Sequence, residues 1–445
     1  MPSKIFRDPL YNYIALDLDK GRDNWLLELL DCPEIQRLRR IHQLGVSYLT
    51  YPGADHNRLA HSLGVLHMML QALKHLEGMS KDEQVNQARA PLLAAALAHD
   101  VGHGPFSHLY EFNPPLRPGH PKNHEVWSQR IILEDTNINR VLRGVNQYLP
   151  QFVADLIEEK NHKHPAWMKY LLSSQLDVDR LDYLRRDSLF TGAGFGHFDW
   201  FRILNTFEFH EAGGQRSIVW PEKSKLAIEE YVFARYYMYQ NVYLHKTTRG
   251  FEKLIEAMWR RAKKLHDDDT DVNLLPPIRD FWATQEPTDQ QYLAIEEYTV
   301  LYQIQLWTTS KDKSLNDLAR RFLHRERLAV VAPPSSTGQL VPESEKWETA
   351  LDELTRNGGF EPEMYCLEDT IKTKYNAPYS PEKEADEQSV KNAIRIKIDG
   401  EECPVEIVKL LPRLVSVTTE STHRVRYYVP KELQQEAFRL RANWK

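Results

Sequence analysis

Cysteine is scarce in this chain of 445 residues, and its three cysteines, Cys32, Cys366 and Cys403, lie far apart. Because no two of them have the close spacing of a thiolate metal site or a disulfide framework, we expect free thiols in a reducing compartment. Long apolar runs are missing as well. The longest, around residues 91–98, is far too short to cross a bilayer, and residues 1–20 lack the apolar core of a signal peptide. These absences predict a soluble cytoplasmic protein with no membrane partner, or a nuclear one in a eukaryote.

An excess of positive charge is also absent, since 57 lysines and arginines stand against 63 aspartates and glutamates, for a net charge of −6. This balance argues against a protein that binds nucleic acid mainly through an overall positive field, but it is compatible with a local basic face. Single-stranded nucleic acid is therefore a possible partner that the sequence does not indicate. The content of 42% hydrophobic and 27% charged residues is that of an ordinary globular protein. The sequence contains no internal repeat and no long low-complexity tract, so a repeat array is excluded.

Helical periodicity dominates the chain up to about residue 328. Apolar residues recur every three or four positions from about Asn24 and again from Leu59, and helices resume near Val126, Val153, Ser173 and Ser224 and over residues 289–328. Residues 1–20 alternate in polarity around a turn, which predicts a short hairpin-like entry. Loops are predicted at residues 105–120 and at about 263–287, where proline or acidic residues gather. We therefore expect an all-helical domain over residues 1–328.

The rest of the chain has a different pattern. The stretch from about 329 to 390 is rich in proline, serine, glutamate and glycine, which predicts an irregular or mobile connection. Residues 391–445 contain four alternating runs, AIRIKI, VEIVKL, RLVSVTT and HRVRYYV, followed by KELQQEAFRLR. They predict a small antiparallel sheet and a closing helix. The predicted fold class is therefore mainly α, with a small α+β region at the C-terminus.

The residues with metal-ligating chemistry cluster in the helical part. They are His61 in HNRLAHSLG, the pair His99 and Asp100 in LAHDVGHGPFSH, and Asp179 in QLDVDRLDYLRRD. Two imidazoles with two carboxylates suit a divalent ion such as Mn, Fe or Mg better than a structural zinc, which favours thiolates. A lone His-Asp pair is more often a cap or a surface pair, and a lone His61 is more often a satisfied core histidine. The density of histidines between His99 and His124 favours a metal-dependent hydrolase.

The segment around Asp179 gives a second indication. Asp179, Tyr183 and Asp187 are spaced i, i+4 and i+8, so they share one face of a helix, with Arg180 and Arg186 nearby. One interpretation is an exposed face held by salt bridges. The other is a cleft wall that supplies a metal ligand, an aromatic contact and a cation for phosphate. The spacing is compatible with both.

These segments resemble the HD-domain deoxynucleoside triphosphate (dNTP) triphosphohydrolases, which include the vertebrate sterile-alpha-motif and HD-domain enzyme and its bacterial relatives. The resemblance rests on QRLRRIHQLGVSYLTYPGADHNRLAHSLGV, LAHDVGHGPFSH, NHEVWS and DVDRLDYLRRD. It extends from about Lys4 to Leu328 with nearly ungapped local spacing, whereas residues 330–445 match loosely and no sterile-alpha-motif segment is found.

The resemblance implies one divalent metal per catalytic site, held by His61, His99, Asp100 and Asp179, with further Mg accompanying bound nucleotides. It implies hydrolysis at the α-phosphate, which releases deoxynucleoside and inorganic triphosphate. The residues placed around the triphosphate are His103, His108 and His124, and His108 is the first candidate for the general acid. Relatives have an aspartate at the position of Glu111, so a relay through this residue is a departure from the family pattern.

The resemblance also implies a substrate pocket. Its phosphate-binding residues would be Arg58, Arg180 and Arg235, and relatives often have lysine at the position of Arg180. The residues that would surround the sugar are Gln43, Leu44, Tyr183, Asp187 and Tyr243. Leu44 and Tyr243 would crowd the 2′ position and so exclude ribonucleotides by steric contact.

A regulatory nucleotide site at a subunit interface is implied as well, together with a dNTP or GTP-like activator and a homo-oligomer, a dimer or a tetramer. The matching positions are Lys4, Ile5, Asp31, Gln36, Arg39, Arg202, Lys223, His245 and Lys246. Arg7 and Asn241 depart from the family pattern near this site, which leaves the identity of the activator open. For Gln36 and Arg39 the alternative is an ordinary solvated helix face.

Two other functions compete with this one. The first keeps the metal site but acts on another nucleotide, such as a monophosphate or a signalling nucleotide. The second is a nucleotide-sensing module with a relic site, against which stands the presence of all four expected ligands. The residue types at Gln43, Asp187 and Tyr243 favour deoxynucleotides. Some relatives restrict phages or viruses, but no residue pattern here indicates a role in antiviral defence.

Overall fold

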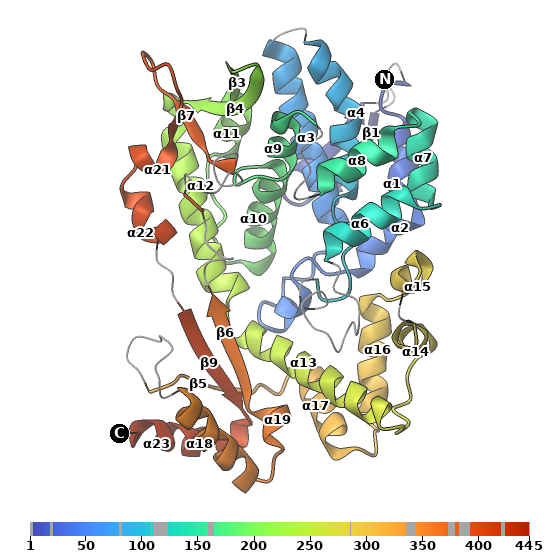
Figure 1. The fold of residues 1–445 in the computed structure, drawn as a ribbon, viewed down its shortest axis with the longest axis vertical. Helices are drawn as coiled ribbons and strands as arrows, with labels where there is room; N and C mark the ends of the chain where they lie inside the picture. Colours follow the sequence, from blue (N-terminus) through green and yellow to red (C-terminus); the bar gives the residue numbers. More distant parts are fainter. Residues whose placement is uncertain are drawn as a thin grey trace.

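The computed structural model describes residues 3–17, 21–79, 82–107, 109, 123–158, 164–284, 286–334, 344–372, 379–381, 392–419 and 423–444. Figure 1 shows an elongated molecule with one group of helices in its upper half and a second group, beside a small sheet, in its lower half. Within the described residues, no helix combines the length and the apolar character needed to cross a membrane.

The chain begins with the expected hairpin. Strands β1 (Ser3–Asp8) and β2 (Asn12–Asp17) pair antiparallel, with Asp8 opposite Asn12 at the turn. Asn12 has a φ of 65°, a conformation that asparagine tolerates better than most residues. Ile14 and Leu16 are buried, so one face of the hairpin packs on the helices and the other faces outward.

Three helices position the candidate site. Helix α3 (Arg58–Met79) packs against α4 (Glu83–Ala98) and against α10 (Val178–Thr191). Helix α4 is buried from Leu92 to Ala98 because it is apolar nearly all round, as its sequence predicts. The helices that surround these three are α1 (Trp25–Leu30), α2 (Pro33–Gln36), η2 (Arg37–Arg40), η3 (Gly45–Leu49), α6 (His124–Leu133), α7 (Asn137–Val145), α8 (Leu149–Ile157) and α9 (Ala166–Leu172).

The following part of the chain begins in the upper half of the molecule and ends in its lower half (Figure 1). It contains α11 (Trp200–Thr206), β3 (Glu208–Ala212), β4 (Gln215–Pro221), η4 (Glu222–Ser224), α12 (Lys225–Met238), the π-helical η5 (Tyr239–Tyr243), α13 (Lys246–Asp267), α14 (Pro276–Trp282), α15 (Asp289–Leu293), α16 (Glu297–Trp307) and α17 (Lys313–Leu323). The predicted fold class, mainly α, is confirmed, but the predicted helical domain over residues 1–328 also contains β3 and β4, whose turn at Gly213 and Gly214 has positive φ at both glycines. Helix α14 likewise occupies part of the predicted loop at 263–287.

The C-terminal strands form two sheets and not one. Strands β7 (Arg395–Lys397) and β8 (Val405–Glu406) extend the hairpin of β3 and β4 in the order β3-β4-β7-β8, with β4 and β7 parallel. Strand β9 (His423–Val429) lies between β5 (Ala329–Val331) and β6 (Leu367–Lys372) in the other sheet. The closing helix α23 (Gln434–Ala442) is present as predicted.

Two further expectations for this region are wrong. The run RLVSVTT is helix α22 (Arg413–Thr419), and VEIVKL is divided between β8 and helix α21 (Ile407–Leu410). The stretch predicted to be irregular contains α18 (Ser344–Asn357), α19 (Pro362–Tyr365) and β6. Short apolar runs do not distinguish a strand from a buried helix. Here Ile407 and Leu414 are fully buried in the same core as the helices of the main domain, so tertiary packing decides their conformation.

Candidate metal centre

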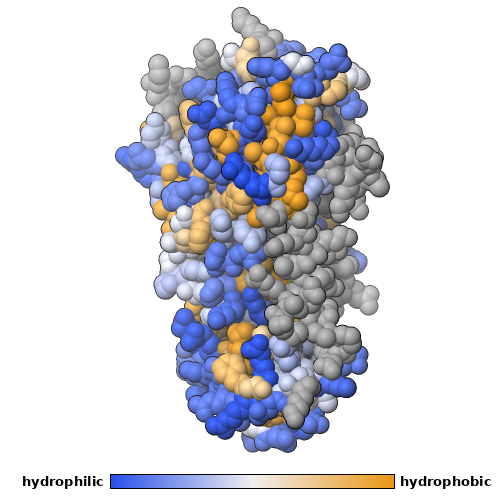
Figure 2. Space-filling view, turned by 90° about the vertical axis from the view of Figure 1, so that its left-hand side faces the viewer, coloured by the Kyte–Doolittle hydropathy of each residue, from blue (hydrophilic) through white to orange (hydrophobic). Residues whose placement is uncertain are grey.

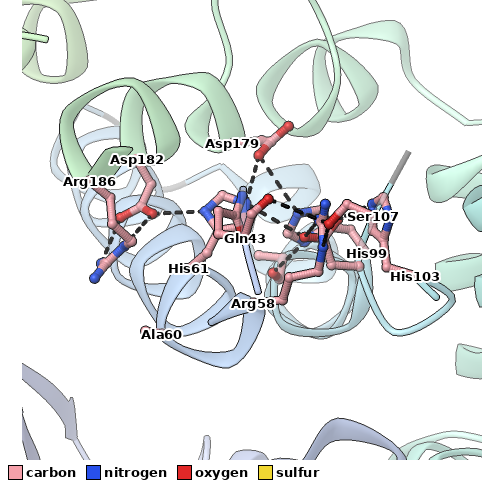
Figure 3. Close-up of polar contacts among 12 residues, drawn as sticks. Gln43, Arg58, Ala60, His61, His99, His103, Ser107, Asp179, Asp182 and Arg186 are labelled. Carbon is pink, nitrogen blue, oxygen red and sulfur yellow. Dashed lines mark hydrogen bonds and ion pairs between the residues drawn. The ribbon is translucent and has the colours of Figure 1, made fainter. Parts of the chain in front are cut away.

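Three separate segments bring four potential metal ligands together (Figure 3). His61 lies on α3, His99 caps the C-terminal end of α4 with Asp100 beside it, and Asp179 lies in the first turn of α10. Nε2 of His61 is 2.9 Å from Oδ1 of Asp179 and 3.8 Å from Oδ2 of Asp100. Nε2 of His99 is 3.3 Å from Oδ1 of Asp100 and 3.7 Å from Oδ1 of Asp179. The four side chains therefore face one another.

The chemistry of these four residues fits a divalent cation. Nε2 of His99 is buried and makes no hydrogen bond to any described residue. Burial alone would raise the pKa of Asp100, but the neighbouring Arg58 and His99 lower it well below its ordinary value. Burial opposes the charged form of His61, yet Asp179 and Asp182 raise its pKa to about 10. Ionised carboxylates beside imidazole nitrogens are suitable ligands for a borderline or hard divalent ion.

The second ring nitrogen of His61 is held by a residue that we did not predict as functional. Nδ1 of His61 lies 2.8 Å from Oδ2 of Asp182, a fully buried carboxylate. A carboxylate that accepts the Nδ1 proton leaves Nε2 as the ligand atom, which is a common arrangement around protein-bound metals. Asp182 follows Asp179 by three positions, so the sequence placed it near the site but did not show that it faces His61.

Two of the predicted catalytic residues lie next to the metal centre. Nε2 of His103 is 3.3 Å from Oδ1 of Asp100, and its ring stacks on that of His124 at a centroid distance of 3.8 Å. Burial, together with the charge of Arg58, lowers the pKa of His103 to about 4. His124 is the first residue of α6, where Asn123 caps the helix. His108 and Glu111 lie outside the described residues.

The three predicted phosphate-binding arginines are buried or half-buried near the centre. Nη1 of Arg58 is 2.5 Å from Oδ2 of Asp100, and its Nε donates to Ser107 at 3.1 Å. Arg180 contacts Asp177, the cap of α10, and Arg235 lies on α12, which packs against α10. The Nε atoms of Arg180 and Arg235 are buried and have no hydrogen-bond partner among the described residues. On this side of the metal centre, two buried N–H groups therefore have no hydrogen-bond acceptor among the described residues.

Among the residues predicted to surround a sugar, Tyr183 and Asp187 lie on α10 and Tyr243 is the last residue of η5. Asp187 accepts hydrogen bonds from Tyr243 at 2.9 Å and from Nε2 of His56 at 2.7 Å. The ring of Tyr183 lies 6.4 Å from His61 and 6.3 Å from Tyr243. Oε1 of Gln43 is buried without a hydrogen-bond partner in the described chain, and Leu44 packs against the core. No sequence pattern predicts a role for His56, because its contact with Asp187 depends on the tertiary fold.

A buried glutamate supports the loops that approach the centre. Phe106 and Ser107 have φ values of 57° and 56°, a left-handed conformation that is costly for residues with side chains. Oε1 of Glu297 accepts from the backbone N–H groups of His42 and Phe106, at 2.9 and 3.0 Å. Oγ of Ser107 donates to the carbonyl of His42 at 3.0 Å. These contacts hold the loop before His108 against the segment that carries Gln43.

His42 gives the folded protein a predictable pH dependence. Burial lowers its pKa, but contacts with Glu297 and Asp55 outweigh burial and raise it to about 9. The stabilisation by protonated His42 is therefore complete below its ordinary pKa of about 6.5 and is lost as the pH rises to about 9. We expect the free energy of unfolding to fall by on the order of 2 kcal/mol in this window. The variant His42→Gln, measured in urea across the same pH range, should lack this decline, and an equal decline in both proteins would contradict the assignment.

The predicted regulatory residues fall into three groups within one chain. Lys4 and Ile5 lie on β1, whereas Asp31 follows α1 and Gln36 and Arg39 lie on α2 and η2, with Arg39 donating to Gln36 at 2.7 Å. Arg202 and Lys223 lie on α11 and η4, and His245 and Lys246 begin α13. Figure 1 shows α11 and α13 in different halves of the molecule. Within the described part of one chain, these residues do not form a single site.

The chain is similar to known proteins that contain an HD domain. The family model described as HD domain matches residues 58–187, which include all four potential ligands. The uncharacterized protein YwfO of Bacillus subtilis is 38% identical over 372 residues, which cover 82% of this chain and 79% of that protein. The human deoxynucleoside triphosphate triphosphohydrolase SAMHD1 is 26% identical over 386 residues, which cover 79% of this chain and 58% of the human protein.

A solved structure extends the similarity to the whole fold. The crystal structure of a phosphohydrolase from Bacteroides thetaiotaomicron has a TM-score of 0.76 and 25% identity, and the match covers 96% of this chain and 99% of the other. HD domains bind divalent metals, in agreement with the facing ligands described above. This chain therefore belongs to the HD-domain phosphohydrolase family that includes the SAMHD1 dNTP triphosphohydrolases.

Proposed function

We propose that this protein hydrolyses deoxynucleoside triphosphates to deoxynucleoside and inorganic triphosphate. The observation that carries the proposal is the orientation of His61, His99 and Asp100 toward Asp179, beside buried arginine donors that have no acceptor. His61, His99, Asp100 and Asp179 would hold one Mn, Fe or Mg ion. When bound, such an ion lowers the pKa of a water molecule and withdraws charge from phosphate oxygens.

The side chains around the centre suit a nucleoside triphosphate. Guanidinium groups with a buried Nε–H that has no partner among the described residues, as on Arg180 and Arg235, are complementary to phosphate oxygens. Arg58 would bind the phosphate nearest the centre, because it already lies between Asp100 and Ser107. These three cations would stabilise the negative charge that builds up during the reaction. The triphosphate specificity is supported by the named activity of the SAMHD1 relatives.

The residues predicted to surround the sugar would distinguish deoxyribose from ribose. Oε1 of Gln43 is a buried acceptor without a partner, and the carboxylate of Asp187 retains acceptor capacity beyond its bonds to His56 and Tyr243. A 3′ hydroxyl has one hydrogen and would donate it to one of these two acceptors. Tyr243 and Leu44 would fill the space beside C2′. Exclusion of ribonucleotides would then follow from shape.

Regulation by a dNTP or GTP-like nucleotide in a homo-oligomer forms part of the proposal. The proposed regulatory residues are dispersed in one chain, which is the expected arrangement for a site completed between subunits. Large apolar side chains are exposed on α11 and α12, among them Phe201 at 62% and Leu226 at 57%. Figure 2 shows apolar side chains gathered mainly toward the upper end of one otherwise largely hydrophilic face. Exposed apolar groups of this kind favour contact with another subunit.

A product assay tests the proposed reaction. The full chain, loaded with Mn²⁺, is incubated with each dNTP alone and with mixtures, and nucleoside is separated from nucleotide products by chromatography. We expect deoxynucleoside and inorganic triphosphate, with little activity on ribonucleotides, and mixtures reveal activation by a second nucleotide. Turnover of monophosphates or signalling nucleotides alone would indicate the alternative hydrolase, whereas release of monophosphate and pyrophosphate from a dNTP would contradict the proposed reaction. Binding of nucleotides without any turnover would indicate a sensing module.

A further inference from the structure

A buried network joins the N-terminal hairpin to the metal centre. The hydroxyl of Tyr11, in the turn between β1 and β2, donates to Oδ1 of Asp182 at 2.7 Å. Oδ2 of Asp182 lies 2.8 Å from Nδ1 of His61. Tyr11 and His61 are therefore connected through one fully buried carboxylate, although 171 positions separate Tyr11 from Asp182.

The acceptor positions of Asp182 are fully used. Arg186 donates through Nε to Oδ2 at 2.8 Å and through Nη2 to Oδ1 at 3.0 Å, in addition to the contacts with Tyr11 and His61. Each carboxylate oxygen thus accepts two hydrogen bonds, which is the capacity of an ionised carboxylate. Because four donors fix its position, loss of the hydroxyl of Tyr11 would leave Oδ1 with Arg186 as its one remaining donor and would loosen the carboxylate that holds His61.

The hairpin is held to the same network at a second point. Nη1 of Arg186 lies 2.8 Å from Oδ2 of Asp8, the last residue of β1. Oδ1 of Asp8 accepts from the backbone N–H groups of Leu10 and Tyr11, at 2.9 and 3.0 Å. The turn therefore keeps the hydroxyl of Tyr11 in place through Asp8 and Arg186. Arg186 itself is completely buried, so its charge depends on these partners.

We propose that Tyr11 is a positioning residue for the metal centre, and that metal binding and the order of the β1–β2 hairpin are coupled. The inference rests on the proposed function through the role of His61 as a ligand. Asp182 directs Nε2 of His61 toward the other ligands, and Tyr11 keeps Asp182 in position. By linkage, a metal ion that orders His61 must also favour the ordered hairpin, and whatever orders the hairpin must favour metal binding.

Coupling through the hairpin would connect the metal centre with the proposed regulatory site. Lys4 and Ile5 lie on β1, in the same hairpin as Tyr11, and Ile5 is 54% exposed. A nucleotide or a subunit that covers this strand would order the hairpin without contacting the metal centre. Its effect would reach His61 through Tyr11 and Asp182.

The variant Tyr11→Phe tests the proposal because it removes only the hydroxyl. The ring keeps its contacts with His67, at a centroid distance of 4.6 Å, and with Trp200, at 6.2 Å, so we expect the variant to fold. Tyr13→Phe is the matched control, since Tyr13 lies on the same hairpin and is 52% exposed. Mn²⁺ affinity is measured by calorimetry on the metal-stripped full chain. Hydrogen exchange of residues 3–17 is followed with and without Mn²⁺.

We expect Tyr11→Phe to weaken Mn²⁺ binding about 3- to 10-fold, in line with the loss of one hydrogen bond to a charged group. Asp182→Asn should weaken it about 10- to 100-fold, as for other residues that orient a ligand, and Tyr13→Phe should have no effect. Mn²⁺ should slow exchange in the hairpin of the natural chain and of Tyr13→Phe, but much less in Tyr11→Phe. The effect of Mn²⁺ on hydrogen exchange in the hairpin can therefore be measured in the natural chain alone, without a variant.

The possible failures are distinguishable. Unchanged Mn²⁺ affinity in Tyr11→Phe would overturn the proposal, even if its hairpin exchanged faster in both states, because Tyr11 would then have only a structural role. Unchanged hairpin exchange on adding Mn²⁺ to the natural chain would also overturn it. Absence of Mn²⁺ binding to the natural chain would instead overturn the proposed metal centre, and the coupling with it.

Discussion

Replacement of both His99 and Asp100 by alanine should abolish hydrolysis of dNTPs. The double variant lacks two of the four proposed ligands, and the remaining pair, His61 and Asp179, provides too few donors to retain a divalent ion. A metal ion contributes several kcal/mol to such a reaction, so we expect activity to fall about 1000-fold or more. The measurement is release of deoxynucleoside from each dNTP, together with the metal content of the purified protein.

Control variants show whether a loss of activity comes from loss of the metal ligands or from loss of the folded structure. His324→Ala alters an exposed histidine after α17 and should leave activity and metal content unchanged. Asp100→Ala leaves the buried Arg58 without its carboxylate, which is destabilising, so Asp100→Asn serves as a second variant that retains a hydrogen-bond acceptor. Thermal unfolding shows whether each variant is folded. Turnover by a folded variant that lacks His99 would refute the assignment of this centre.

Replacement of Gly64 by alanine should strongly destabilise the folded protein. Gly64 lies on α3, three positions after His61, and a Cβ atom there would lie 1.9 Å from Oδ1 of Asp182 and 2.5 Å from Nη2 of Arg186. Both neighbours are fully buried and hydrogen-bonded, so neither can move without loss of partners. We expect the free energy of unfolding in urea to fall by about 3 kcal/mol.

The same helix provides the matched control for this substitution. Gly78 is exposed on α3, and a Cβ atom there would meet nothing within 4 Å. Since alanine favours helix more than glycine does, Gly78→Ala should be neutral or stabilise the protein by up to about 1 kcal/mol. Gly64→Ala should also lower Mn²⁺ affinity, because Asp182 contacts His61. Equal stability of the two variants would contradict the close packing of α10 on α3.

Local pattern was sufficient for much of the fold. The alternation around Asp8 and Asn12 predicted the hairpin, and the helical periodicity from Leu59 predicted α3, both of which are confirmed. Where an apolar run was short, the pattern of apolar residues did not predict the correct secondary structure. RLVSVTT alternates like a strand but forms α22, because Leu414 is buried against the helical core. The hairpin of β3 and β4 was missed even though its two adjacent glycines are a recognised turn signal.

The sequence by itself determined which chemical groups are available and on which elements they lie. It showed an imidazole and a carboxylate, His99 and Asp100, directly after the apolar run at residues 91–98, and it placed Asp179, Tyr183 and Asp187 on one face of a helix. Only the tertiary structure decided their partners, such as Asp182 for His61 across 121 positions and Glu297 for His42 across 255. Helical periodicity is a local property, whereas these contacts depend on how separate helices pack, which no spacing along the chain encodes.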